Sequence, residues 1–209
     1  MNNSVSYVIL LKIFFQREVF MNVYDFDDTI YDGESGLDMF FYFLKKDASL
    51  LKIIPKVFKA FTEYKNGNVT IEQAIEKYIP MIEDYLGKNP GLFSDTADFW
   101  DKHMKNIKSF YADIQKPDDL IITASPEDSM KEICARIGIK NYIGTKIDAE
   151  TGKITRLCMR ENKVKAFFDE FPDGKIDTFY TDSLENDKSL IDIAESAYVV
   201  KGDKLIKIK

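Results

Sequence analysis

The order of the expected strands and helices constrains the fold of this chain most. Residues 21–30 (MNVYDFDDTI) predict a short buried strand that ends in acidic residues. Residues 34–115 then have the pattern of helices, with almost no strand signal, and from Leu120 onward short apolar runs alternate with amphipathic segments. Alternation of strands and helices is typical of parallel strands joined by crossover helices. We therefore predict an α/β protein with a layered sheet core and an all-helical insert after the first strand.

This pattern divides the chain into three regions. Residues 21–33 and 116–209 are expected to form the α/β core, and residues 34–115 the helical insert. Residues 1–20 precede the first strand as an N-terminal extension.

Two helices of the insert have clear signals. Thr70 and Gln73 have the spacing of a capping box, and Pro80 is expected to kink the helix that they begin. Apolar residues spaced three and four apart predict another helix from about Ser94 to Ile114. Both helices should pack as a small bundle.

The first twenty residues contain an apolar run from Val5 to Phe15 that is interrupted by Lys12. This run is shorter than the roughly 20 apolar residues that a membrane-spanning helix needs. No positive charge precedes it and no small-residue cleavage site follows it, so a signal peptide is also disfavoured. We expect a disordered arm or a start codon upstream of the true start at Met21; an extra strand and a surface-lying arm are the alternatives.

Composition argues against several classes of function. With 45% hydrophobic and 31% charged residues, the 209-residue chain can bury a core, and its net charge of −6 without a basic block disfavours nucleic-acid binding. Two cysteines, Cys134 and Cys158, provide no disulfide framework, which favours a cytoplasmic protein. The single histidine, His103, disfavours a zinc site and is expected to be a partly buried residue of the insert.

Acidic and hydroxyl side chains stand at the ends of three predicted strands. In chain order they are Asp25 and Asp27, then Thr123 followed by Ser125, then Asp182 with Asn186 and Asp187. The carboxyl ends of parallel strands meet at one edge of a sheet, where ligands bind. Convergent carboxylates repel one another and need a cation or a shared proton, and oxygen ligands favour Mg²⁺. A lysine at this edge would complete a site for phosphoryl transfer.

Four motifs in this order resemble the haloacid dehalogenase (HAD) superfamily, and most closely its phosphoserine-phosphatase-like subgroup. They are DFDDTIYDGES, ITASPE, KVKAFF and YTDSLENDKSL, and the resemblance spans about residues 21–201. It implies a Rossmann-like parallel sheet with an inserted helical cap. It also implies a Mg²⁺-dependent phosphatase that forms an aspartyl-phosphate from a small phosphomonoester.

The resemblance also implies a role for each motif residue. Asp25 would be the nucleophile, Asp27 the general acid and base, Thr123 a hydrogen-bond donor to the phosphoryl group, and Lys163 the basic residue, with Lys165 as the alternative. Asp25, Asp27 (through its carbonyl oxygen) and Asp182 would bind the metal. The last acid of the motif is Asn186 or Asp187, and we favour Asp187 because a carboxylate binds a cation more strongly than an amide does.

Three further residues are expected near the substrate: Glu34, Thr29, which would support the loop that positions Asp27, and Ser125. Glu34 lies nine residues after Asp25, where phosphoserine phosphatases have a glutamate that contacts the substrate amine. No arginine occurs between Arg17 and Arg136, however, and those enzymes use a cap arginine to bind the serine carboxylate. Phosphoserine is therefore disfavoured as the substrate.

Two other functions remain open. A phosphotransferase or phosphomutase would use the same residues and a different phosphoryl acceptor. A non-catalytic regulatory domain that binds Mg²⁺ or phosphate would not need the Asp25 and Asp27 pair or the helical insert. A membrane partner is not expected, and the sequence does not predict the oligomeric state.

Overall fold

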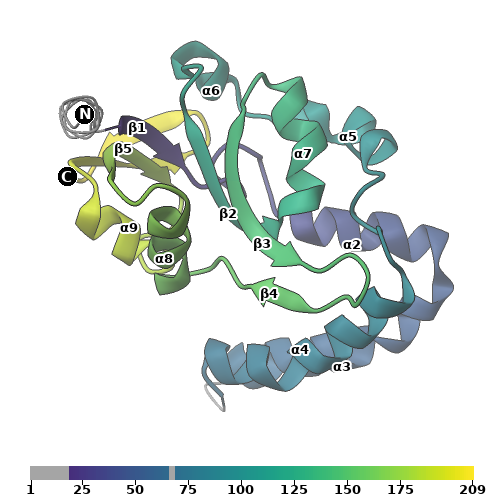
Figure 1. The fold of residues 1–209 in the computed structure, drawn as a ribbon. Coiled ribbons are helices and arrows are strands. Elements are labelled where there is room, and N and C mark those ends of the chain that lie inside the picture. The colour runs from purple at the N-terminus through teal and green to yellow at the C-terminus, as the bar shows by residue number, and fades with distance from the viewer. Residues whose placement is uncertain (1–18, 66–68) are drawn as a thin grey trace, which may run out of the picture.

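A central sheet of seven strands organises the part of the chain that a computed structural model describes, residues 19–65 and 69–209. The strands are β1 (Val19–Tyr24), β2 (Leu120–Pro126), β3 (Asn141–Ile147), β4 (Ile154–Arg156), β5 (Gly174–Thr181), β6 (Ser196–Lys201) and β7 (Lys204–Lys207). Their order is β4-β3-β2-β1-β5-β6-β7, with β1 in the middle (Figure 1). The inner strands are parallel, whereas β4 and β7 pair antiparallel at the two edges. This sheet confirms the predicted α/β class.

The central strand begins earlier than the sequence pattern indicated. Val19 pairs with Gly174 and Phe20 pairs with Lys175, so β1 includes two residues that we had assigned to the N-terminal extension. Pairing with β5 extends the strand beyond the apolar run that predicted it. The other residues of that extension, 1–18, lie outside the described residues.

Helices cover both faces of the sheet and form the insert between β1 and β2. Those of the insert are α2 (Ser35–Lys46), α3 (Ile54–Lys65), α4 (Ile71–Lys88), α5 (Ala97–His103) and α6 (Ser109–Ile114), with short 3₁₀ turns at Ala48–Lys52 and Met104–Asn106. Those of the core are α7 (Glu127–Arg136), α8 (Glu161–Glu170) and α9 (Lys188–Ile193). Within these described ranges no helix is long and apolar enough to cross a membrane.

Alternate residues of the central strands serve two separate cores. Tyr24 and Ile121 point into one cluster with Met130 of α7, and Val23 points into another with Phe167 of α8. This alternation is the period of two that a strand imposes on its side chains. It places α7 and α8 on opposite faces of the sheet (Figure 1).

The capping box is confirmed, but the second predicted helix of the insert is not continuous. The backbone N–H of Thr70 donates to Gln73 (2.9 Å) and that of Gln73 donates to the Thr70 hydroxyl (3.2 Å), and α4 continues through Pro80. The helix predicted over residues 94–114 is instead broken into α5 and α6. It breaks because Ile107 takes an extended conformation and the next N–H, of Lys108, donates to the carbonyl of Ile30.

The two ends of the insert have different surroundings. Helices α2, α3 and α4 extend away from the sheet, whereas α5 and α6 return to it beside α7 (Figure 1). Trp100 of α5 is fully buried in the same core as Met130, and its indole N–H donates to the carbonyl of Ser129 (3.2 Å). The projecting cap is therefore made of α2 to α4, and α5 and α6 are part of the layer that covers the sheet.

Candidate active site

A cavity of about 150 Å³ lies at the carboxyl edge of the sheet, where the sequence predicted that acidic side chains would meet. It is lined by residues that follow β1 and β5, by one residue of β2, and by the start of α8 with the two residues before it. They are Asp25, Asp27, Glu34, Ala124, Met159, Arg160, Lys163, Asp182, Ser183, Asn186 and Asp187. The structure thus brings together most of the predicted site residues, from segments up to 162 residues apart.

Lys163 is the centre of charge in this cavity. Its ammonium group lies 2.9 Å from Asp25 and 2.7 Å from Asp187, and its side chain is only 6% exposed. Burial alone would lower the pKa of Lys163, but the two carboxylates raise it above its ordinary value. The lysine is therefore held as a cation next to Asp25.

Asp25 has a buried carboxyl group with one opposing charge. Burial raises its pKa well above the ordinary value, Lys163 acts against this shift, and the neighbouring Asp187 adds to it. Its backbone N–H donates to the carbonyl of Tyr180 (2.9 Å), which continues the pairing of β1 with β5 to the edge of the cavity. The strand therefore fixes the position of this carboxylate.

Asp27 has a different environment from Asp25. One carboxylate oxygen accepts the backbone N–H of Ser35 (2.6 Å), and the other accepts the hydroxyl of Ser125 (3.1 Å). Burial raises the pKa of Asp27, and these hydrogen bonds oppose the shift. A carboxyl group with a raised pKa is suited to giving and taking a proton near neutral pH.

The loop after β1 is held in an uncommon backbone conformation. Asp28 has a φ of +50°, which few residues other than glycine adopt. Its N–H donates to the carbonyl of Gly33 (2.9 Å), the N–H of Gly33 donates back to the Asp28 carboxylate (3.0 Å), and Lys108 donates to the Asp28 carbonyl. Lys108 comes from the far end of the insert, and no pattern in the sequence pointed to it.

Three predicted site residues lie behind the cavity and do not line it. Thr29 is fully buried, and its hydroxyl lies 3.4 Å from the carboxylate of Asp182, which it positions. Thr123 is also fully buried, and its oxygen accepts the N–H of Ser125 (3.1 Å). Ser125 in turn donates to Asp27. In this structure Thr29 and Ser125 contact acidic residues, and Thr123 contacts Ser125.

Glu34 does line the cavity, at the residue that precedes α2. It is exposed, and its pKa is raised by partial burial and by the charges of Asp27, Asp28 and Asp182. A cationic group of a ligand would relieve this repulsion.

The end of β5 supplies a residue that the sequence analysis missed. The hydroxyl of Thr181, which is fully buried, donates to Asp187 (2.7 Å). Asp187 is therefore held between Thr181 and Lys163, whereas Asn186 is exposed at the cavity. Which of Asn186 and Asp187 contacts a metal stays a prediction. A threonine directly before Asp182, as the last residue of a buried strand, was the available signal for Thr181.

The donor set of the cavity fits a magnesium ion. Among the described residues, no three histidine, cysteine or acidic side chains converge closely enough to hold a metal by themselves. Mg²⁺ does not require such a cage, because it is commonly held by one or two carboxylates together with water and substrate phosphate. Asp25 and Asp182 line the same cavity, and the pKa of Asp182 is raised by burial and by the charges of Asp187 and Asp28. A cation next to these two carboxylates would offset the free energy that it costs to keep them ionised there.

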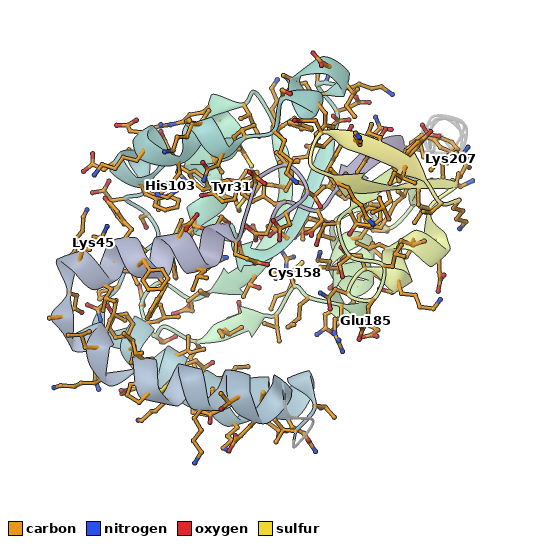
Figure 2. The ribbon with its side chains drawn as sticks, turned by 180° about the vertical axis from the view of Figure 1, so that it is seen from behind. Tyr31, Lys45, His103, Cys158, Glu185 and Lys207 are labelled. Carbon is orange, nitrogen blue, oxygen red and sulfur yellow. The ribbon has the colours of Figure 1, made fainter. Side chains whose placement is uncertain are left out.

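His103 is partly buried as expected, and neither His103 nor Cys158 lines this cavity. His103 lies beside Tyr31 (Figure 2), with its Nδ1 atom 2.8 Å from the tyrosine oxygen, and its side chain is 24% exposed. Cys158 is fully buried.

Comparison with known proteins identifies the family. Residues 23–191 match the haloacid dehalogenase-like hydrolases. The chain belongs to this family. The resemblance that its motifs suggested is thereby confirmed at the level of the superfamily. No curated protein matches the chain.

Two solved structures share the fold of this chain at low sequence identity. A Bordetella pertussis protein described as having unknown function matches with a TM-score of 0.60 and 18% identity, over 84% of this chain and 87% of the other. A phosphoserine phosphohydrolase-like protein from Francisella tularensis matches with a TM-score of 0.52 and 15% identity, over 87% and 86% of the two chains. At such identities the matches show a shared fold. The second carries the name of the subgroup that the motifs resemble.

Proposed function

We propose that this HAD-family hydrolase is a Mg²⁺-dependent phosphatase that hydrolyses a small phosphomonoester through an aspartyl-phosphate. The observation that carries the proposal is the position of Lys163, which is buried between Asp25 and Asp187 at the cavity that Asp27 also lines. This arrangement supplies a nucleophile, a proton carrier and a cation within one cavity. Its two buried cysteines, both free, are compatible with the cytoplasm, which we propose as its location.

In the first step the carboxylate of Asp25 attacks phosphorus, and the bond between phosphorus and the alcohol oxygen breaks. Asp27, protonated at the start of this step, gives its proton to the departing alcohol. The Lys163 ammonium group offsets charge on the phosphoryl oxygens. Asp25, Asp182 and the carbonyl oxygen of Asp27 would hold Mg²⁺, which would supply further positive charge.

In the second step Asp27, now ionised, takes a proton from a water molecule that attacks the phosphorus of phospho-Asp25. The bond between phosphorus and Asp25 breaks, inorganic phosphate leaves, and both aspartates return to their starting states. Ser125 and the N–H of Ser35 hold the Asp27 carboxylate in place throughout. Asp187 and Thr181 hold Lys163 in position.

The proposal is tested by the hydrolysis of an aryl phosphate with and without Mg²⁺. We expect Mg²⁺-dependent release of phosphate that is lost in Asp25→Asn, and an acid-stable mass increase of one phosphoryl group on Asp25 in Asp27→Asn. Asp192→Asn, an exposed aspartate of α9, is the matched control and should keep full activity. Activity that survives in Asp25→Asn would overturn the nucleophile assignment, and an inactive but folded wild type would overturn the phosphatase proposal.

A further inference from the structure

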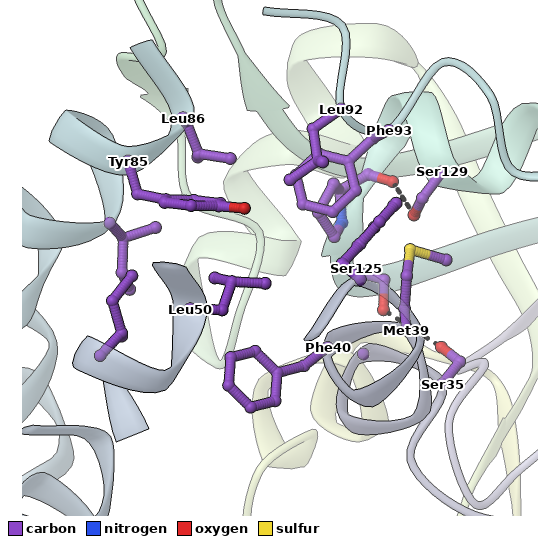
Figure 3. A pocket seen from close by; sticks show the side chains of 15 residues that line it. Ser35, Met39, Phe40, Leu50, Tyr85, Leu86, Leu92, Phe93, Ser125 and Ser129 are labelled. Atoms are coloured by element: carbon purple, nitrogen blue, oxygen red, sulfur yellow. Dashed lines mark hydrogen bonds between the residues drawn. The ribbon is translucent and has the colours of Figure 1, made fainter. Parts of the chain in front are cut away.

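A second and larger cavity, of about 270 Å³, lies between the cap and the core. The cap contributes α2, α4, the 3₁₀ turn after α2 and the loop after α4, and the core contributes the end of β2 and the start of α7. The lining residues are Ser35, Gly36, Met39, Phe40, Phe43, Leu50, Ile53, Ile82, Tyr85, Leu86, Leu92, Phe93, Ser125, Pro126 and Ser129. Figure 3 shows Phe40, Leu50 and Tyr85 converging on one side of this space, and Ser35 and Ser125 on another.

Two residues that line this cavity are hydrogen-bonded to the proposed proton carrier, Asp27. Ser35 and Ser125, which line it, are the residues whose N–H and hydroxyl groups donate to Asp27. Their two side-chain oxygens lie 3.4 Å apart (Figure 3), which is a weak contact between small side chains. This pair of serines therefore connects the wall of the apolar cavity to Asp27.

The remaining wall is apolar. Met39, Phe43 and Leu50 are almost completely buried, and no charged side chain of the described residues lines the cavity. The hydroxyl of Tyr85 is already used, because it donates to Asp47 (2.9 Å). A charged group placed here would lose its hydration without gaining a partner, which is costly. The wall therefore selects an apolar occupant.

The size of the cavity also suits a substrate fragment. An enclosed apolar cavity of roughly 150 Å³ is enough to bind benzene. A space of about 270 Å³ can therefore hold an aromatic ring with substituents or an alkyl chain.

We propose that this cavity binds the alcohol part of the substrate, and that the substrates are phosphomonoesters of apolar alcohols, aryl or alkyl. The inference deepens the proposed function and rests on it. The phosphoryl group lies with Asp25 and Lys163, and the apolar group extends past Ser35 and Ser125 into the cavity. When the phosphorus–oxygen bond breaks, Asp27 protonates the alcohol oxygen at the boundary between the two cavities.

The first experiment compares kcat/KM of the full chain for ethyl, butyl, hexyl and octyl phosphate, and for phosphoserine and glycerol phosphate. Burial of each methylene group should raise kcat/KM about fourfold until the cavity is filled. Phosphoserine and glycerol phosphate should be poorer substrates than butyl phosphate, because their charged or polar groups would be desolvated.

A second measurement does not depend on turnover. Calorimetric titration with alkylphosphonates of the same lengths should give affinities that rise with chain length. Their binding should also have an increasingly negative change in heat capacity, as expected when apolar surface is buried. Affinity that is independent of chain length would overturn the inference.

Two neighbouring phenylalanines of α2 provide matched variants. Phe40 lines the cavity, whereas Phe41 is 49% exposed and does not line it. Phe40→Ala should reduce the preference for octyl over ethyl phosphate at least about fivefold, and Phe41→Ala should leave that preference unchanged. Equal effects of the two substitutions would overturn the assignment of the cavity.

The failures of the two proposals are distinguishable. If no phosphate is released from any ester but alkylphosphonates bind with increasing affinity, the phosphatase proposal fails and the apolar site stands. If short polar esters are hydrolysed best and chain length has no effect, the phosphatase proposal stands and the apolar site fails.

Discussion

The ammonium group of Lys163 lies 2.7 Å from the carboxylate of Asp187, and the two side chains are 6% and 1% exposed. Asp187 also accepts the hydroxyl of Thr181, so both of its oxygens are used inside the protein. Such a pair is costly to bury and is stable only while every member is satisfied. The Lys163–Asp187 pair lies beside Asp25, and it therefore fixes a cation next to the proposed nucleophile.

Asp187→Asn should therefore reduce stability and activity together. The substitution leaves Lys163 with Asp25 as its remaining carboxylate partner, and we expect the free energy of unfolding to fall by about 2–4 kcal/mol. We also expect kcat to fall at least about tenfold, because Lys163 is then held closer to the nucleophile and less well oriented. Urea unfolding and steady-state kinetics measure the two effects.

The control is the same substitution in an exposed ion pair. Lys188 and Asp192 lie 2.8 Å apart on α9, and their side chains are 72% and 59% exposed. Asp192→Asn should change the free energy of unfolding by less than about 0.5 kcal/mol. Similar destabilisation by Asp187→Asn and Asp192→Asn would contradict the importance of burial.

The acidic residues of this site could be predicted from the sequence because strand ends carry local signals. Asp25, Asp27 and Asp182 each follow an apolar run, and parallel strands bring such ends to one edge. The resemblance to the HAD superfamily then selected Lys163. Thr181 was missed because Thr178 and Tyr180 of the same strand also carry hydroxyl groups, so a hydroxyl alone did not distinguish it.

Long-range contacts of the insert could not be predicted in the same way. The break between α5 and α6 results from Lys108, which donates to the carbonyls of Ile30 and Asp28 on the loop after β1. Helical periodicity reports which face of a segment is apolar, and it contains no information about backbone groups 80 residues away. The serine partners of Asp27 were likewise fixed by tertiary structure, since Ser35 and Ser125 are 90 residues apart.

His103 should make the protein sensitive to mild acid. Burial lowers the pKa of His103, as do Lys105, Lys102 and Lys45, while Asp38 opposes the shift. The folded protein therefore resists protonation that the unfolded chain accepts near its ordinary pKa of about 6.5. Stability should fall as the pH drops from about 6.5 toward the lower folded pKa, because the unfolded state then binds more protons.

His103→Gln is the variant that tests this pH dependence. Urea unfolding at pH 7.5 gives the cost of the substitution itself, and the change between pH 7.5 and pH 5 gives the contribution of the imidazole. The wild type should lose more stability over this interval than the variant. A difference between the two proteins that is independent of pH would contradict the prediction.

The two cysteines should be unreactive in the folded protein. Burial raises the pKa of Cys134 to about 12 and that of Cys158 to about 11, so little thiolate is present at pH 8. An aromatic disulfide reagent should label them at least about 100-fold more slowly than an exposed cysteine. Lys204→Cys on β7 supplies that reference, because Lys204 is exposed. Both native cysteines should react at once in guanidinium chloride, and rapid labelling without denaturant would contradict the packing described here.

The turn between β3 and β4 holds the cap through a close approach of two backbones. Gly152 has a φ of +71°, and a Cβ atom at this position would lie 2.1 Å from the backbone nitrogen of Gly87 in α4. Gly202 has a similar φ of +59° but has nothing within 4 Å of such an atom. Gly202→Ala should lower the free energy of unfolding by about 1 kcal/mol, the penalty for placing alanine in a left-handed conformation. Gly152→Ala should lower the free energy of unfolding by clearly more, because its added methyl group also pushes α4 away from the core.

Hydrogen exchange separates these two effects of alanine. In Gly152→Ala the amides of α4 should exchange faster, and so should Ile154, whose N–H donates to Glu83 of α4 (2.9 Å). In Gly202→Ala the exchange of α4 should match the wild type, although the global stability falls. If the two variants gave the same exchange pattern, the contact at Gly87 would not hold the cap. Faster exchange of α4 and Ile154 in Gly152→Ala, but not in Gly202→Ala, would establish the turn as the attachment that keeps the cap over the cavity lined by Ser35 and Ser125.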